Sequence, residues 1–262
     1  MWLALFALVA STAVPSSHAA TCDAKALTKA LADAPPNQAG KAFSDLAACD
    51  PAAANKAAPA AFEKILAGET GDQAVVSAIA VGAGPTVRAW VNKQEPDDRS
   101  RTISKLGEKC DQPGVPGFFL DTQKELGEKF WSERWYRGLD DCRAKEVQEL
   151  LRARIAQPGG DRTLFFGVVE VFSRNLGKDA IPALKAAVQN EKDPEIATYL
   201  INAFADAAGV GSTKGADPEA VKLAVAAVNE VAPQLPPKAV DQARTTLLAL
   251  GAEADSDRLA VV

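Results

Sequence analysis

Apolar residues recur at helical spacing through most of the chain. After Asp193 they stand three, four, seven, eight and eleven residues beyond the first one, so they share one helix face. The same spacing returns between Cys142 and Gln157 and after Pro237. No segment alternates apolar and polar residues long enough to be a strand. The pattern predicts an all-α protein, and its three clearest stripes are Ile196, Tyr199, Leu200, Ala203, Phe204 and Ala207; Val147, Leu150, Leu151 and Ile155; and Val240, Ala243, Leu247 and Leu250.

One apolar run, residues 164–172, fits either a buried strand or a buried helix. Periodicity alone does not separate the two in a short run. The apolar positions continue at helical spacing to Leu176 and stop at Gly177. We therefore expect a buried helix.

Two helix starts have the same residue types. Residues 193–195 and 217–219 both read Asp-Pro-Glu. The Asp is a good N-cap, Pro suits the first helical position, and the Glu lies at the positive end of the helix dipole. Looser versions occur at Asp50-Pro51 and Glu95-Pro96. We expect a helix to begin at each of these places.

Residues 177–209 resemble a HEAT repeat. A first helix with an early proline, Pro182, is followed by a turn bearing Asp193-Pro194 and a second helix that closes at Gly209. Fainter copies occupy residues 59–82, 85–107 and 217–251. The resemblance implies stacked helix pairs in a right-handed α-α superhelix, whose concave surface binds other macromolecules. For this length we expect about ten to twelve helices.

The first nineteen residues have the layout of a cleavable secretory signal. A short apolar run from Trp2 to Val14 is followed by Pro15 and by the small-residue site at 17–19. The run is too short to cross a bilayer, which takes about 20 residues. We expect an exported protein, periplasmic or extracellular, without a transmembrane segment. The form of the signal and the lack of an N-x-S/T acceptor indicate a bacterial source.

Four cysteines follow the signal, and an even number in an exported chain favours disulfides. Three pairings are possible. Cys22 opens one predicted helix and Cys49 closes the next, so the pair would join the open end of an antiparallel hairpin. Cys110 ends a helix and Cys142 begins another, so the second pair would close the segment between them. A lipid anchor at Cys22 is not expected, because the preceding residues do not match lipoprotein processing.

The segment 111–141 departs from the repeats. It belongs to a disulfide-linked N-terminal region, 20–142, which C-terminal HEAT-like repeats follow at 143–262, and it is dense in aromatic residues. Trp131 and Trp135 would share one face of a continuous helix. This helix either packs on two neighbours or exposes the aromatic and arginine residues typical of binding hot spots. The predicted partner-binding residues are Phe119, Trp131, Trp135, Tyr136 and Arg137.

Charge and composition exclude several classes of function. The net charge is −5, both signs are mixed along the chain, and no basic cluster offers a nucleic-acid footprint. The single histidine, His18, lies in the signal. Without imidazole and with paired cysteines, the mature chain lacks a Ser-His-Asp or Cys-His nucleophile and a histidine-ligated zinc. We expect no cofactor and no metal.

Two polar runs partly resemble known ligand-binding loops. Residues 209–215 resemble a phosphate cradle, but Gly215 follows Lys214 where a Ser or Thr is needed, so we expect a loop between repeats. Residues 253–257 resemble part of a calcium loop and lack its glycine and its twelfth-position Glu.

These observations predict an exported, non-enzymatic binding scaffold that presents a helical-repeat surface to a protein or an envelope polymer. One alternative is a secreted hydrolase or lyase that uses paired acids, at 97–98, at 140–141 or within 253–257. Another is a purely structural envelope protein whose aromatic residues all lie in the core.

Overall fold

The computed structural model describes residues 22–66, 72–157, 161–212 and 215–252. Across these ranges the regular secondary structure consists of α-helices and short 3-10 turns, without a strand. The predicted all-α class is confirmed. The predicted signal, Lys214 and the acidic run at 253–257 lie outside the described residues.

Eight α-helices and a 3-10 turn precede the second half of the chain. They are α1 (Ala24–Asp33), α2 (Pro36–Cys49), α3 (Pro51–Leu66), α4 (Asp72–Ala80), α5 (Gly84–Asn92), α6 (Pro96–Gly107), α7 (Val115–Leu126), α8 (Glu128–Ser132) and η1 (Trp135–Leu139). The second half contains α9 (Lys145–Ile155), α10 (Arg162–Leu176), η2 (Gly177–Ala180), α11 (Ile181–Asn190), α12 (Pro194–Ala207), α13 (Pro218–Val231), η3 (Ala232–Gln234) and α14 (Pro237–Ala249). The ambiguous run at 164–172 lies within α10, as predicted.

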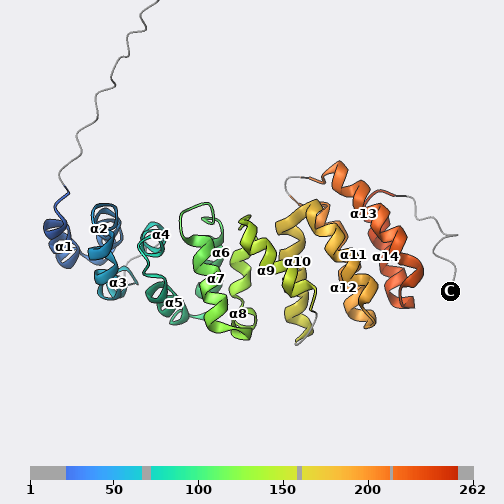
Figure 1. Ribbon diagram of the computed structural model, residues 1–262, viewed down its shortest axis with the longest axis horizontal. Coiled ribbons are helices and arrows are strands. Elements are labelled where there is room, and N and C mark those ends of the chain that lie inside the picture. Colours follow the sequence, from blue (N-terminus) through green and yellow to red (C-terminus); the bar gives the residue numbers. More distant parts are fainter. Residues whose placement is uncertain (1–21, 67–71, 158–160, 213–214, 253–262) are drawn as a thin grey trace, which may run out of the picture.

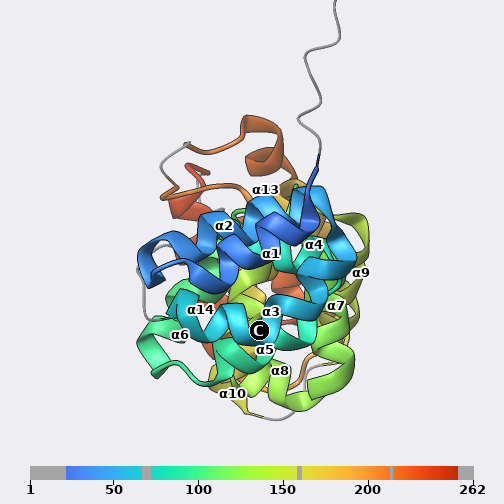
Figure 2. The ribbon, with the colours of Figure 1, turned by 90° about the vertical axis from the view of Figure 1, so that its left-hand side faces the viewer.

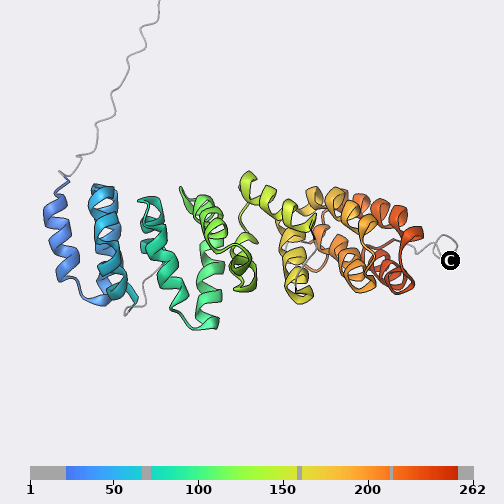
Figure 3. The same ribbon diagram turned by 60° about the horizontal axis from the view of Figure 1, so that its bottom comes forward.

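The helices follow one another along the long axis of the molecule, from α1 at one end to α14 at the other (Figures 1 and 3). Seen from the α1 end, the later helices lie behind the first ones (Figure 2). Many helices contact both the next helix and the next but one: α12, for example, packs on α10, α11, α13 and α14. The buried apolar side chains form one cluster from Leu31 to Leu250. The array therefore has a continuous core.

The two Asp-Pro-Glu sequences start helices as predicted. The Asp193 side chain accepts hydrogen bonds from the backbone N–H groups of Glu195 (2.9 Å) and Ile196 (3.3 Å). The Asp217 side chain accepts one from the Glu219 N–H (2.9 Å). The hydrogen bond from the Glu195 N–H is the main cause that lowers the pKa of Asp193. Such a cap contributes about 1 kcal/mol to helix stability.

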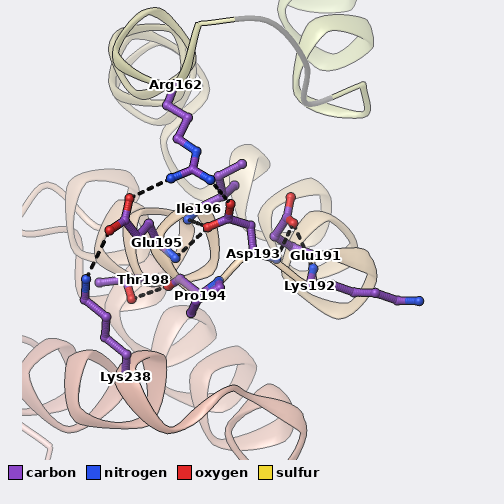
Figure 4. Close-up of polar contacts among 9 residues, drawn as sticks. All are labelled: Arg162, Glu191, Lys192, Asp193, Pro194, Glu195, Ile196, Thr198 and Lys238. Carbon is purple, nitrogen blue, oxygen red and sulfur yellow. Dashed lines mark hydrogen bonds and ion pairs between the residues drawn. The ribbon is translucent and has the colours of Figure 1, made fainter.

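Ion pairs link the starts of α10, α12 and α14 (Figure 4). Arg162, the first residue of α10, pairs with Asp193 and, at 2.8 Å, with Glu195 at the start of α12. Lys238 on α14 lies 3.5 Å from Glu195. Exposed pairs contribute little each, about 0–1 kcal/mol. Together they hold the starts of three stacked helices at one edge of the array.

Both predicted disulfides are present. Cys22 pairs with Cys49 across a sequence separation of 27, and Cys110 pairs with Cys142 across 32. The first joins Cys22, two residues before α1, to the last residue of α2, and the second joins the chain after α6 to the chain before α9. Loops of this length contribute about 3–4 kcal/mol each in the chain-entropy estimate. The sulfur of Cys22 is therefore occupied by Cys49 rather than available for a lipid.

Two glycines allow α6 and η1 to touch backbone to backbone. A Cβ atom on Gly107 would lie 2.1 Å from the carbonyl oxygen of Gly138. A Cβ atom on Gly138 would lie 2.4 Å from the Phe119 ring and 2.8 Å from the Ile103 carbonyl oxygen. Because the obstructing atoms are mostly backbone, they have no easy way to move aside. This contact packs η1 directly against α6.

Replacing Gly107 with Ala tests this contact. We expect Gly107→Ala to lower the free energy of unfolding by about 2–3 kcal/mol, because the added methyl overpacks the junction. Gly117→Ala is the matched control, since nothing lies within 4 Å of its Cβ position on α7. That control should gain about 0.5–1 kcal/mol, as Ala favours a helix over Gly. Thermal and urea unfolding of both variants would measure the difference, and equal stabilities would contradict the proposed role of Gly107.

Candidate functional site

The aromatic segment is not the continuous helix that the sequence predicts. Helix α7 ends before Gly127, which has a φ of 54°, and α8 is only five residues long. Arg134 then takes a φ of 64°, and the chain continues as the 3-10 turn η1. Trp131 and Trp135 therefore lie on different elements. The prediction that they share one helix face is wrong, because α8 ends at Ser132 and the left-handed Arg134 interrupts the helical period between the two tryptophans.

Four of the five predicted partner-binding residues lie in the core. The exposed fractions are 0 % for Phe119 and Trp135 and 3 % for Trp131 and Tyr136. Trp131 stacks on Tyr136 with ring centroids 6.2 Å apart. The exposed aromatic patch is thus ruled out, and the interpretation of these rings as packed side chains is confirmed. Arg137 alone among the five is partly exposed.

Residues 132–143, here called the junction segment, are held in place by several long-range contacts. Gly138 contacts Gly107, and Cys142 is bonded to Cys110. The side-chain amide of Asn175 donates to the carbonyl oxygens of Cys142 (2.8 Å), Asp140 (3.3 Å) and Leu139.

A close approach to α10 adds to these contacts. A Cβ atom on Gly167 would lie 2.2 Å from the Tyr136 hydroxyl oxygen, so the Tyr136 ring needs glycine at this point of α10. The junction segment therefore lies across α10 in a defined position.

The first pocket lies between the start of the junction segment, α10 and α12, and has a volume of about 360 Å³. Phe166 and Tyr199 stack in it, with ring centroids 4.0 Å apart and planes at 9°. Both rings are half-buried. The lining residues are Ser132, Arg134, Tyr136, Arg137, Asp161, Thr163, Leu164, Phe166, Gly167, Glu170 and Tyr199.

The second pocket, about 410 Å³, lies between the end of the junction segment and the C-terminal ends of α10 and α12. Its lining includes Asp140, Asp141, Arg143, Arg174, Lys178 and Asp206, together with residues 207–209. Arg174 Nη1 lies 3.6 Å from Asp140 Oδ2, and its other terminal nitrogen pairs with Glu170. Arg143 Nη1 donates to the Arg174 carbonyl oxygen at 2.9 Å.

Two carboxyl groups in the second pocket have a raised pKa. Burial raises the pKa of Asp140 and of Asp206 above the ordinary value for Asp, and the Glu170 carboxylate raises both pKa values further. The Arg174 guanidinium opposes the effect at both groups. The pKa of Tyr199 is also raised, first by burial and then by Glu170 and Asp206.

The two pockets lie end to end along the same pair of helices. Glu170 in the first and Arg174 in the second are four residues apart on α10, and Tyr199 and Asp206 are seven apart on α12. The junction segment borders both. These positions define the candidate site, which we call the α10 groove.

The sequence indicated part of this groove. Tyr136 and Arg137 were predicted to bind a partner, and both line the first pocket. The acidic pair Asp140-Asp141 lines the second pocket. The other described acidic pair, Asp97-Asp98, lies exposed in the first turn of α6, where Asp98 pairs with Arg101. Among the groove residues that sequence reasoning missed are Arg134, Phe166, Arg174 and Tyr199.

The groups available for chemistry are limited in the part of the chain that the structure describes. All four cysteines are in disulfides. Over the described ranges no group of three or more His, Cys, Asp or Glu side chains could hold a metal ion. Among the described helices, none combines the length and the apolar character that a membrane span requires.

No protein-family model, curated protein or solved structure matches this chain. The HEAT-like character of residues 177–209 therefore stays an interpretation of the sequence pattern. In the structure these residues contain η2, α11 and α12, with Pro182 in the first turn of α11.

Asp206→Asn tests the electrostatics of the second pocket. The pKa of Asp206 is raised in the folded state, so this side chain contributes to the free energy of unfolding when it is protonated. The contribution is complete below the pKa that Asp206 has in the unfolded chain. That contribution is lost as the pH rises through the folded-state pKa. Asn cannot ionise, so the variant should have a higher Tm than the wild type at about pH 7 and a smaller advantage at about pH 4. Thermal unfolding across this pH range measures the effect. The control is Asp241→Asn on the exposed side of α14, and the same pH-dependent gain there would contradict the explanation.

Proposed function

We propose that this chain is an exported, non-enzymatic binding scaffold that presents the α10 groove to a protein partner. In this proposal the helix pairs form a right-handed, HEAT-like superhelix, and the two pockets lie on its binding surface. The stacking of α10, α12 and α14 supports this arrangement. The two disulfides are compatible with an oxidising compartment outside the cytoplasm.

One observation carries the proposal: the junction segment and α10 form two adjoining pockets that are held by contacts outside the pockets themselves. Binding sites are usually concave and largely formed before the ligand arrives. The first pocket combines half-buried aromatic rings with arginine side chains, a composition typical of binding hot spots. Arg134, at its edge, keeps a left-handed backbone conformation, and strained residues of this kind cluster at ligand sites.

Thr163→Trp tests the function with little risk to the fold. Thr163 is exposed at the start of α10 and lines the first pocket, so a large ring there should fill the pocket. In a crosslinking pull-down from the envelope of the source organism, we expect recovery of the wild-type partner to fall about tenfold or more.

Thr245→Trp is the matched control, because Thr245 is exposed on α14 and lines none of the described pockets. Recovery should be unchanged in this variant. Burial of Trp131 and Trp135 favours another candidate, a purely structural envelope protein. Equal recovery by wild type and Thr163→Trp would contradict groove binding and favour that candidate.

The raised pKa values of Asp140 and Asp206 favour one enzymatic candidate, a hydrolase or lyase with paired acids. A carboxyl group with a raised pKa is a better general acid near neutral pH. The binding proposal predicts that wild type and the double variant Asp140→Asn/Asp206→Asn release equal, background amounts of reducing ends from envelope polysaccharide. Release by the wild type that the double variant lacks would overturn the non-enzymatic proposal.

A further inference from the structure

The first pocket contains two arginines without an acidic partner. Within the described part of the chain, neither Arg134 nor Arg137 forms an ion pair. Arg134 is exposed, and the Arg137 guanidinium carbon lies 5.9 Å from the centroid of the Tyr136 ring. Three other arginines near this groove do have acidic partners: Arg154 with Glu128, Arg162 with Asp193, and Arg174 with Glu170.

The two acids that line the same pocket are already engaged. Asp161 caps α10 and accepts a hydrogen bond from the Leu164 N–H at 3.2 Å. Glu170 pairs with Arg174. Within the described residues the pocket therefore has two guanidinium groups without an acidic partner, while its Glu170 is paired with Arg174 and its exposed Asp161 carboxylate caps α10. Guanidinium groups bind carboxylates in a bidentate geometry, so an acidic ligand complements this charge.

The remaining lining is largely apolar. Leu164, Phe166, Tyr199 and the Tyr136 ring form this part, while the hydroxyl groups of Ser132 and Thr163 lie among the lining residues. An apolar side chain is buried favourably at the same surface.

We propose that the first pocket binds an acidic peptide segment of the partner protein. An apolar side chain of the peptide packs against Phe166 and Tyr199, and a neighbouring Asp or Glu carboxylate is bound by Arg134 and Arg137. This inference rests on the proposed binding function and specifies the chemistry of the partner.

Two peptide pools of equal length test the inference. In each pool a central apolar residue is flanked by random neutral residues. The residue directly after the apolar one is Asp or Glu in one pool and Asn or Gln in the other. The full chain is immobilised, and the retained peptides are quantified by mass spectrometry. We expect the acidic pool to be enriched about tenfold on the wild type. Equal retention of the two pools would overturn the inference.

The variant Arg134→Gln/Arg137→Gln should abolish this enrichment. The control Arg99→Gln/Arg101→Gln removes the same charge from α6, outside the groove, and should keep it. Arg134→Lys/Arg137→Lys keeps the charge but not the bidentate geometry, so intermediate enrichment is expected. Circular dichroism and Tm verify that each variant is folded. Enrichment that survives Arg134→Gln/Arg137→Gln, or retention of polygalacturonate in place of peptides, contradicts the acidic-peptide proposal.

The native partner separates this inference from the function on which it rests. If Thr163→Trp loses the partner and Arg134→Gln/Arg137→Gln keeps it, the groove binds a protein but not through an acidic segment. If Thr163→Trp also keeps the partner, the proposed function itself fails. Loss in both variants, with acidic enrichment on the wild type, supports both proposals.

Discussion

The backbone contact between Gly107 and Gly138 is the constraint on which the rest of the structure depends. Apart from the five-residue α8, the helices have nine to sixteen residues, and isolated helices of this length are marginal in water. Their stability therefore comes from packing between neighbours along one continuous core. In the middle of the array, a side chain on either glycine would hold α6 away from η1. The buried Phe119 ring lies against Gly138 at this contact.

The same contact gives the α10 groove its form. Once Gly138 is held against α6, the disulfide at Cys142 and the amide of Asn175 hold the end of the junction segment. The Tyr136 hydroxyl fits over Gly167 at its start. One short segment therefore borders both pockets and brings different groups to them: Arg134 and Arg137 to the first, and the acidic pair Asp140-Asp141 together with Arg143 to the second. A partner that contacts both pockets would be oriented by this difference.

The edge of the array is organised by different forces. Aspartate caps and prolines fix where α12 and α13 begin, and exposed ion pairs align the starts of α10, α12 and α14. These contacts are weak one by one, whereas the core packing is strong. The edge pairs thus set the register of neighbouring helices and contribute less to their stability. The proposed HEAT-like binding surface would need both a rigid core and a regular spacing of its helices.

The sequence by itself determined the features that depend on neighbours close along the chain. Helical periodicity and Asp-Pro starts are local, and helix order was sufficient to choose the disulfide pairing. Tyr136, Arg137 and the acidic pair at 140–141 were also recognised as candidates for function. Only the tertiary structure decided how the aromatic segment is arranged, because the shared face of Trp131 and Trp135 required a continuous helix. It also decided that Phe166 and Tyr199 are half-exposed, since burial depends on contacts between segments far apart in the chain.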